Sequence, residues 1–272
     1  MYRTLLSFIT SIFLCAAFSS EAQERTDWAL KAVQYERAAF DAGDPYDAAE
    51  ALVAKAECYK PLRRYGAAAA TLGRVSMYML APERRDDVLY EKELCSYLAG
   101  DFAGAASYME EAGETAAPRR LLLDALVLGE CARWDESRSR AGALLSSLYS
   151  GAELEAARRE LDGLFSGVPK LKTEKQAVFR SFLPPLGHLY TGHLSEGLVS
   201  AGINTAAAGW TVWQCLSGNW VTGILGGGIA LSSTFMGGMA RSAELVEEYN
   251  HDALRGFNDA LRALLLQHDF AE

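Results

Sequence analysis

The sequence is poor in the residues that build metal centres and active sites. Its 272 residues include five cysteines, and no two of them have the C-x-x-C spacing of a zinc site. His188 and His193 are five residues apart, which does not place two ligands on one face of a helix. The chain also lacks G-x-S-x-G, H-E-x-x-H and phosphate-binding glycine motifs. We therefore expect a protein that is not an enzyme, with no catalytic residues, no metal and no cofactor.

Positive charge and strand-like patterns are also scarce. Asp and Glu total 35 against 26 Lys and Arg, which gives a formal net charge of -9. This balance argues against nucleic acid as a partner, because phosphates call for a basic surface. No segment alternates apolar and polar residues with the two-residue period of a strand, and helix-favouring alanine is abundant. The sequence predicts an all-α protein.

Residues 1–22 have the pattern of a secretory signal peptide. Arg3 precedes an apolar run, residues 5–18, that is short for a bilayer span. Ser20 and Ala22 are small residues at the positions that a signal peptidase reads, so we expect cleavage just after Ala22. The alternative is an uncleaved N-terminal anchor. Both interpretations place the following segment outside the cytoplasm.

From residue 23 to residue 166 the pattern is helix, short turn, helix. Apolar residues recur at helical spacing, and Gly or Pro marks most of the breaks. After a first helix that starts near Asp27, the expected helices cover residues 46–60, 64–80, 85–99, 102–114, 118–132, 134–149 and 151–166.

Three of these turns share a pattern that indicates a repeat. Each has an aromatic residue at the start of the second helix, Tyr65, Phe102 or Trp134, and a small residue three positions later. The pattern resembles the tetratricopeptide repeat, which has a period of about 34 residues and packs helices in pairs. The resemblance predicts a solenoid of helix pairs over residues 23–166, and the alternative is an irregular helical bundle. The small residues are Ala68, Ala105 and Ser137.

A solenoid of helix pairs presents a curved surface to a peptide or protein. The residues that we expect on its concave, partner-binding face are Glu57, Tyr90, Tyr97 and Arg119. Cys58 and Cys95 each precede a turn aromatic by seven residues. An oxidising compartment permits a disulfide between them, and the alternative is that both pack as small apolar residues in helix interfaces.

A later region lacks charge altogether. Between Glu196 and Arg241 there is no Asp, Glu, Lys or Arg, a length that fits two spans of about 20 residues. We expect residues 196–241 to form a transmembrane hairpin of two helices, 197–215 and 220–240. Small residues allow close helix packing in lipid. The glycines expected at this contact are Gly223, Gly226, Gly227 and Gly228. A buried helical hairpin of a soluble protein is the alternative.

Residues 167–195 join these regions and contain the most distinctive stretch of the sequence. A lysine-containing linker, residues 169–173, precedes residues 180–192, which read RSFLPPLGHLYTG. Prolines stop the preceding helix and glycines permit unusual backbone angles, so we expect a loop where the chain enters the membrane. The residues of this motif are Pro184, Pro185, Gly187, His188, Tyr190 and Gly192.

The same stretch resembles a family pattern, P-G-L-G-Q-x-Y-x-G followed by G-x-x-S and two membrane helices. In several groups of diderm bacteria this module follows a signal peptide and tetratricopeptide-like repeats, and a Tyr-Asn pair follows the second helix. Pro185 and His188 replace the Gly and the Gln of the pattern. The resemblance implies a membrane-associated repeat protein and does not imply catalysis. The matching residues are Pro184, Leu186, Gly187, Tyr190, Gly192, Gly197, Ser200, Asn204, Tyr249 and Asn250.

Residues 242–272 have the pattern of an amphipathic helix with a break near Gly256, placed either on the membrane surface or against the repeats. Together these features predict an exported, membrane-anchored protein with its repeats in the periplasm and its hairpin in the inner or the outer membrane. The expected function is a scaffold for protein–protein interaction in the bacterial envelope, with an envelope protein or peptide and membrane lipid as partners. The alternative is a structural hairpin subunit that forms a homo-oligomer or joins another envelope complex, with the repeats as adaptor.

Overall fold

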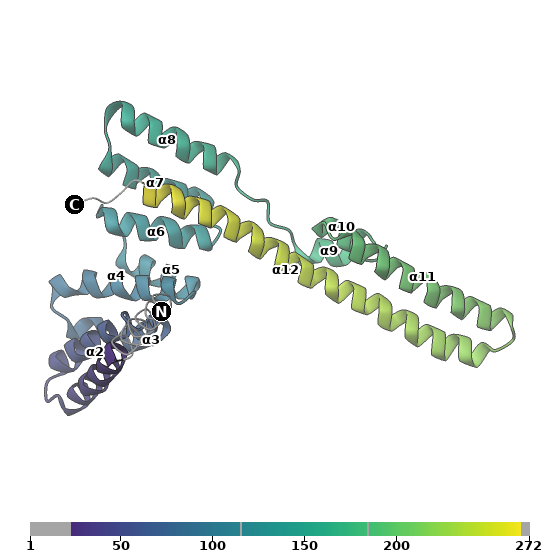
Figure 1. The fold of residues 1–272 in the computed structure, drawn as a ribbon, viewed down its shortest axis with the longest axis horizontal. Helices are drawn as coiled ribbons and strands as arrows, with labels where there is room; N and C mark the ends of the chain where they lie inside the picture. The colour runs from purple at the N-terminus through teal and green to yellow at the C-terminus, as the bar shows by residue number, and fades with distance from the viewer. Residues whose placement is uncertain (1–22, 115, 184, 268–272) are drawn as a thin grey trace, which may run out of the picture. The chain divides into compact units, whose positions relative to one another are not determined.

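The computed structural model describes residues 23–114, 116–183 and 185–267. Over these residues the protein is all-α and contains no strand, which confirms the predicted fold class (Figure 1). The expected signal peptide and Pro184 of the sequence motif lie outside the described residues. The chain forms two compact units, which we call unit 1, up to Asp162, and unit 2, from Gly163 onward.

The helices of unit 1 follow the sequence pattern closely. Proline occupies the first turn of three of them, where its missing N–H costs nothing. The expected helix 64–80 is shorter in the structure, because Gly73, a poor helix former, ends it. The elements are the helix of residues 23–41, α2 (Pro45–Tyr59), α3 (Tyr65–Gly73), the 3₁₀ helix η1 (Met77–Met79), α4 (Pro82–Leu98), α5 (Phe102–Ala112), α6 (Pro118–Glu130), α7 (Trp134–Leu148) and α8 (Gly151–Ser166), whose last residues belong to unit 2.

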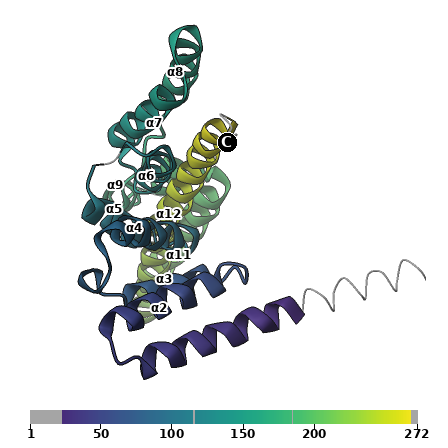
Figure 2. The same ribbon diagram turned by 90° about the vertical axis from the view of Figure 1, so that its left-hand side faces the viewer.

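Successive helices of unit 1 pack in pairs: α2 with α3, α4 with α5, and α6 with α7 (Figure 2). The helix of residues 23–41, purple in Figure 2, is tied to the first pair by Glu36. The Glu36 carboxylate accepts hydrogen bonds from Lys55 Nζ at 2.6 Å and from Arg74 Nη1 at 2.9 Å. These two cations lower the pKa of Glu36 to about 2.

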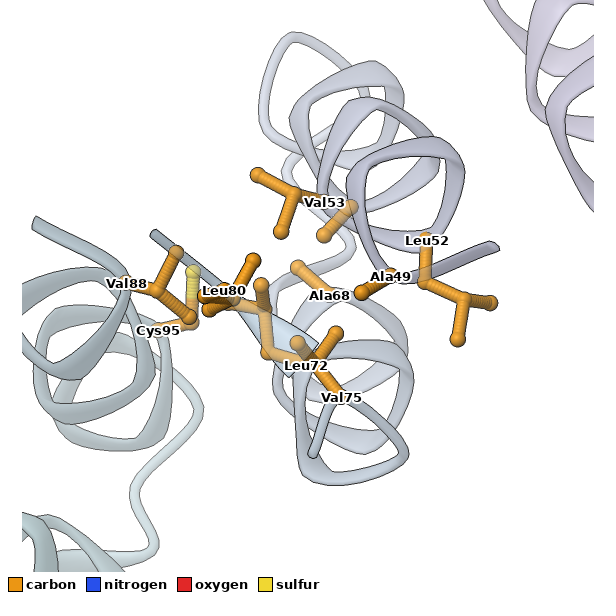
Figure 3. Close-up of a cluster of buried hydrophobic side chains, with 10 residues drawn as sticks. Ala49, Leu52, Val53, Ala68, Leu72, Val75, Leu80, Val88 and Cys95 are labelled. Atoms are coloured by element: carbon orange, nitrogen blue, oxygen red, sulfur yellow. The ribbon is translucent and has the colours of Figure 1, made fainter. Parts of the chain in front are cut away.

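The core of the first pairs is apolar and closely packed. Side chains from α2, α3 and α4 converge in it, among them Val53, Leu72 and Val88 (Figure 3). Cys95 lies in the same cluster. Cys58, a residue of α2, is also buried. Both are free thiols, and the Cys58 thiol donates to the Ala54 carbonyl oxygen at 3.3 Å. The structure therefore agrees with packing, the second of the two interpretations, and not with a disulfide.

Five helix-to-helix turns within the described residues have the same backbone geometry. In each turn one residue has a left-handed φ, between 55° and 91°, and the N–H of the next residue donates to the carbonyl oxygen five residues earlier at 2.9–3.0 Å. This is the Schellman motif, in which a left-handed residue ends a helix and its last carbonyl groups remain satisfied. We call these turns the Schellman corners. Their left-handed residues are Arg63, Gly100, Ala132, Gly192 and Gly218.

At each Schellman corner the next helix begins two residues after the left-handed residue. In unit 1 the first helical residues are Tyr65, Phe102 and Trp134, so the aromatic pattern in the sequence marks these three corners. Unit 2 repeats the geometry at Leu194, which is not aromatic, and at Trp220, an aromatic residue outside the region where the sequence pattern was traced. Three residues further on, a small buried residue lets the two helices approach. These residues are Ala68, Ala105, Ser137, Gly197 and Gly223.

Unit 2 contains α9 (Glu174–Arg180), α10 (Leu186–Thr191), α11 (Leu194–Leu216), the π-helical segment η2 (Thr222–Gly227) and α12 (Gly228–Gln267). α11 runs antiparallel to η2 and the first half of α12, and we call these elements the helix pair (Figure 1). Two expectations for this unit are wrong in detail. The segment expected to be a linker and loop is partly helical, because Pro185 precedes α10 at a position where proline is tolerated.

The second correction concerns the C-terminal segment. The residues from 242 onward do not form a separate helix, since α12 continues without a break from Gly228 to Gln267. No proline follows Pro185 in the chain, and a single glycine such as Gly256 costs a helix only about 1 kcal/mol. The change from apolar to amphipathic sequence therefore occurs within one continuous helix.

Among the described residues one helix, Thr222–Gln267, is long and apolar enough to cross a membrane by length and composition. Its most apolar 18-residue window has a mean hydropathy of 1.2, and 11% of that window is buried. α11 is 23 residues long but does not reach the same hydropathy, because Asn204, Gln214 and many small residues dilute its apolar content. The two expected spans therefore differ, and only the second meets this measure.

The Schellman corners lead to a prediction about stability. Ala132 holds a left-handed conformation that costs a residue with a Cβ about 1 kcal/mol. Ala132→Gly should therefore raise the free energy of unfolding by up to about 1 kcal/mol, and Gly100→Ala should lower it by a similar amount. Chemical unfolding of the full chain in detergent, followed by circular dichroism, measures both changes. Equal stability of the two variants would contradict the corner geometry.

Candidate functional site

Several elements of unit 2 meet near the start of α11. They are the linker after α8, the short helices α9 and α10, and the middle of α12. We call this region the base and define it as residues 170–197 together with residues 238–250. Residues that are far apart in the sequence, including most of those that match the family pattern, contact one another here.

Two glycines allow the base to close. A Cβ at Gly187 would lie 2.8 Å from Ser242 Oγ, so α10 approaches α12 only because no side chain stands there. A Cβ at Gly197 would lie 2.8 Å from Pro185 Cβ and 3.0 Å from His188 Cβ. Both glycines are therefore explained by close packing, since any larger side chain would separate the helices.

His188 packs α10 against α12. It is 5% exposed, and its Nδ1 lies 3.2 Å from Ser242 Oγ. The Ser242 hydroxyl also lies 2.9 Å from the Gly238 carbonyl oxygen, and when it donates there, its oxygen can accept from a protonated Nδ1. Burial lowers the pKa of His188, against the opposing charge of Glu196. The neutral ring and the buried hydroxyl thus form a structural contact between two helices.

Tyr249 and Asn250 fasten the linker to α12. The Asn250 carboxamide accepts from the Lys172 N–H and donates to the Lys172 carbonyl oxygen, both at 2.8 Å. Lys172 Nζ lies 3.3 Å from the centroid of the Tyr249 ring. Tyr190 joins this cluster, with Lys172 Nζ 5.4 Å and the Arg180 guanidinium 4.2 Å from its ring centroid. Tyr249 and Asn250 of α12 therefore bind the linker that precedes α9.

The helix pair is joined by polar side chains along its length. At the base, the Arg241 guanidinium and the Glu196 carboxylate form an ion pair at 3.1 Å. Further along, the Thr234 hydroxyl donates to Asn204 Oδ1 at 2.8 Å. The Asn204 amide group donates in turn to the Ser200 carbonyl oxygen at 2.9 Å. The polar atoms between the helices therefore satisfy one another.

The four glycines expected to pack the helix pair behave differently. A Cβ at Gly223 would lie 2.7 Å from Cys215 Sγ, and a Cβ at Gly227 would collide with a threonine of α11. Gly226 faces a tryptophan ring of α11 at 3.5 Å. A Cβ at Gly228 would meet nothing within 4 Å. The expectation for Gly228 is wrong, because the helical turn directs this residue away from α11.

An open groove of about 500 Å³ lies between α11 and α12 at the base. The Arg241 guanidinium lines it, but three carboxylates hold that charge, from Glu196 at 3.1 Å, Glu244 at 3.2 Å and Glu248 at 2.8 Å. The groove therefore offers no free cation to an anionic ligand and suits an apolar group with few polar atoms. Its other side chains include Val199, Ser200, Ile203, Asn204 and Thr234.

In unit 1 the structure joins two of the residues expected to bind a partner. The exposed Arg119 guanidinium lies 4.9 Å from the centroid of the half-buried Tyr90 ring. Tyr97 packs on Phe102 across the α4–α5 corner, with ring centroids 5.7 Å apart. Glu57 is exposed on α2 and pairs at 2.7 Å with the lysine that follows the same helix. Tyr90 and Arg119 therefore form the most clearly defined surface feature of this set.

A cluster of buried charges in unit 1 was not found by sequence reasoning. Glu93 of α4 and Asp124 of α6 are fully buried. Arg120 Nη2 lies 3.8 Å from Glu93 Oε2, and Arg140 Nε lies 3.7 Å from Asp124 Oδ2. Burial and the Asp124 charge raise the pKa of Glu93 to about 8, so Glu93 keeps its proton at neutral pH. No sequence signal marks the cluster, because a charged residue in a helix normally faces water.

Comparison with known proteins identifies no relative of this chain. No protein-family model, no curated protein and no solved structure matches it. The base itself contains the described residues of the sequence motif: Pro185, Gly187, His188, Tyr190 and Gly192. Lys172 and Ser242, which complete it, were missed. The Tyr-Asn pair was the one sequence signal that pointed to a contact between α12 and the region before α11.

The buried acid of unit 1 predicts a pH dependence. Above a pH of about 4.5 the unfolded chain releases the Glu93 proton, and the folded chain retains it up to about pH 8. Wild-type stability should therefore fall with rising pH across this range, by up to about 1.4 kcal/mol per pH unit. Glu93→Gln should flatten this fall and exceed the wild type in stability at pH 8. Unfolding of the full chain by denaturant at several pH values measures this, with the exposed Glu155→Gln as control. An unchanged slope in E93Q would contradict the assignment.

His188 predicts a matched pair of variants. His188→Gln keeps an N–H donor for Ser242 and should retain the stability of unit 2, whereas His188→Ala should lower the free energy of unfolding by about 1–3 kcal/mol. Because the pKa of His188 is lowered by folding, the unfolded chain takes up a proton first as the pH falls below about 6.5. The wild type should lose stability below that pH, and H188Q should lose less. Thermal unfolding in detergent at two pH values tests this, and a fully stable H188A would refute it.

Proposed function

We propose that this chain is an exported scaffold of the bacterial envelope, anchored in the membrane by the helix pair, and that unit 1 binds an envelope protein or peptide. One observation carries the proposal: the helix pair is polar inside and apolar outside. In water, packed helices bury apolar residues and expose polar ones. In lipid, polar atoms must be satisfied within the protein, and apolar side chains face the solvent.

The interior of the helix pair is built from hydrogen-bonding and small residues. Asn204 is buried and accepts from Thr234, and glycines bring the backbones together at Gly223 and Gly227. The outward side chains are large, apolar and more than half exposed. They include Leu198, Val199, Ile203, Val212, Trp213, Val221, Ile224, Leu225, Ile229 and Met236. An apolar surface of this extent on a soluble monomer is unusual and normally marks an interaction site.

The positions of the charges also support placing the helix pair in lipid. No ionisable Asp, Glu, Lys or Arg side chain occurs between Glu196 and Arg241, and these two residues pair with each other at the base. Hydrocarbon along residues 197–240 would therefore meet no charge, and the first charges would lie together where the pair leaves the membrane. The length of η2 and the first half of α12 suits one span, and α11 lies alongside it.

Unit 1 supports the scaffold half of the proposal. Its helices fold back at three Schellman corners and form successive pairs, an arrangement suited to the exposure of binding side chains. Arg119, whose charge is paired with Asp87, stacks on Tyr90, and side chains of these two types dominate the binding energy of many interfaces. The signal-peptide pattern and the family resemblance favour export, with unit 1 in the periplasm.

The anchoring half is tested by charge on the outward face. Ile203→Lys and Ile224→Lys change residues that are exposed in the structure, so a soluble protein should tolerate them. Within a membrane span each lysine should cost up to about 3 kcal/mol, the value for the span centre, and less toward either end. We expect both variants to lose most of the carbonate-resistant membrane fraction that the wild-type chain shows in cells. Val33→Lys, at an exposed apolar position of unit 1, is the control and should fractionate like the wild type.

The same cells test the export of unit 1 and its binding of a partner. Protease added to spheroplasts should digest unit 1 of the wild type. Tyr90→Ala with Arg119→Ala should weaken recovery of a cross-linked envelope protein. If I203K and I224K remain in the carbonate-resistant membrane fraction as fully as the wild type does, the anchoring proposal is wrong. Recovery of the same partner by the double alanine variant would remove this surface as the binding site.

A further inference from the structure

Four basic side chains of the base, unlike its Arg241, lack the acidic partners that many others in the chain have. In unit 1, arginines of successive helices form ion pairs with carboxylates, such as Arg119 with Asp87 at 2.7 Å. In the stretch from the linker to the end of α9, four basic residues pair with no carboxylate among the described residues, and Glu174 is the one acid there. The four residues are Lys170, Lys172, Lys175 and Arg180.

Aromatic rings hold two of these cations in place without neutralising them. The Arg180 guanidinium lies over Tyr190, and Lys172 Nζ lies over Tyr249 and near Tyr190. A cation stacked on a ring face keeps its full charge and its outward N–H donors. Arg180 and Lys175 are also exposed. The base therefore presents ordered, unneutralised positive charge in a chain whose net charge is -9.

An apolar rim lies beside these cations. Phe179 is 76% exposed and contacts Phe182 edge to face, with ring centroids 6.4 Å apart. Phe182 in turn packs on Phe235 of α12 at 6.0 Å, so the rim is continuous with the outward apolar face of the helix pair. We call this set of exposed residues the apolar rim: Phe179, Phe182, Leu183, Leu186, Leu189 and Leu194.

We propose that the base binds the headgroups of anionic phospholipids in the leaflet that the helix pair enters. Lys172, Lys175 and Arg180 contact the phosphates, and the apolar rim lies against the acyl chains just below them. Short helices with basic and large apolar side chains lie in this way at membrane surfaces. The inference rests on the proposed membrane anchoring and adds a lipid class to it.

A phospholipid accounts for both halves of this surface at once. Its phosphate supplies the counter-charge that Lys175 and Arg180 lack within the chain, and its acyl chains cover Phe179 and Leu183. No Asp, Glu, Lys or Arg occurs from Ser181 to Ser195, and Phe182 of the rim contacts Phe235 within the uncharged stretch of α12. Lipid around the helix pair therefore also reaches the rim, and the cations stand at its edge.

The test uses the full chain reconstituted in vesicles of phosphatidylcholine with a minor share of phosphatidylglycerol. Electron spin resonance of trace spin-labelled lipids measures the relative association of each lipid with the protein. Wild-type protein should favour phosphatidylglycerol severalfold over phosphatidylcholine. Lys175→Gln with Arg180→Gln should bring this preference close to equal association of the two lipids, and added salt should reduce it in the wild type.

Arg255→Gln with Arg262→Gln is the matched control, because it removes the same charge from residues of α12 that pair with Asp259. The control should keep the preference of the wild type. A wild-type protein that inserts but shows equal association with both lipids would overturn the inference and leave the anchoring intact. A wild-type protein that fails to insert would instead overturn the proposed function. If the K175Q/R180Q variant does not insert, the salt titration decides, and a preference unaffected by salt refutes the inference.

Discussion

A Schellman corner makes two demands on the chain at once. One residue must accept a left-handed backbone, and a residue five positions later must be small enough for the two helices to touch. Gly218 and Gly223 meet both demands at the end of the helix pair, and Gly192 and Gly197 meet them at the base. The same geometry forms the helix pairs of unit 1. The antiparallel packing of both units therefore depends on this one constraint on the backbone.

The two units place opposite kinds of side chain inside this common backbone plan. In unit 1, leucines such as Leu72 fill the interior, and ion pairs such as that of Arg119 lie outside. In unit 2, Asn204 and Thr234 meet inside, and isoleucines such as Ile224 point outward. The backbone corners do not determine which arrangement forms. Under the proposed membrane anchoring, the solvent around each unit does, because side chains sort by the medium that they would otherwise face.

The sequence predicted most helix bounds and three corners, because an aromatic residue followed by a small one marks a helix start directly. It also singled out Gly187, Tyr190 and Asn250 as parts of one pattern, but it did not predict that the linker and α12 meet there. It misplaced Gly228, because hydropathy does not tell which side of a helix faces its neighbour after a π-helical segment. It missed Glu93 and its partners, because burial of a charge depends on tertiary contacts alone. It divided α12, because a change in composition was taken for a change in backbone.

The undivided α12 has a mechanical consequence. Its 40 residues extend over about 60 Å, roughly twice the thickness of a hydrocarbon core. Asn250 fastens the linker near the midpoint of this helix, and Ser242 fastens α10 about two turns earlier. When α12 tilts as a rigid body about these two contacts, residues 251–267 move in the opposite direction to its apolar half. An unbroken α12 therefore couples the position of residues 251–267 to the tilt of its apolar half.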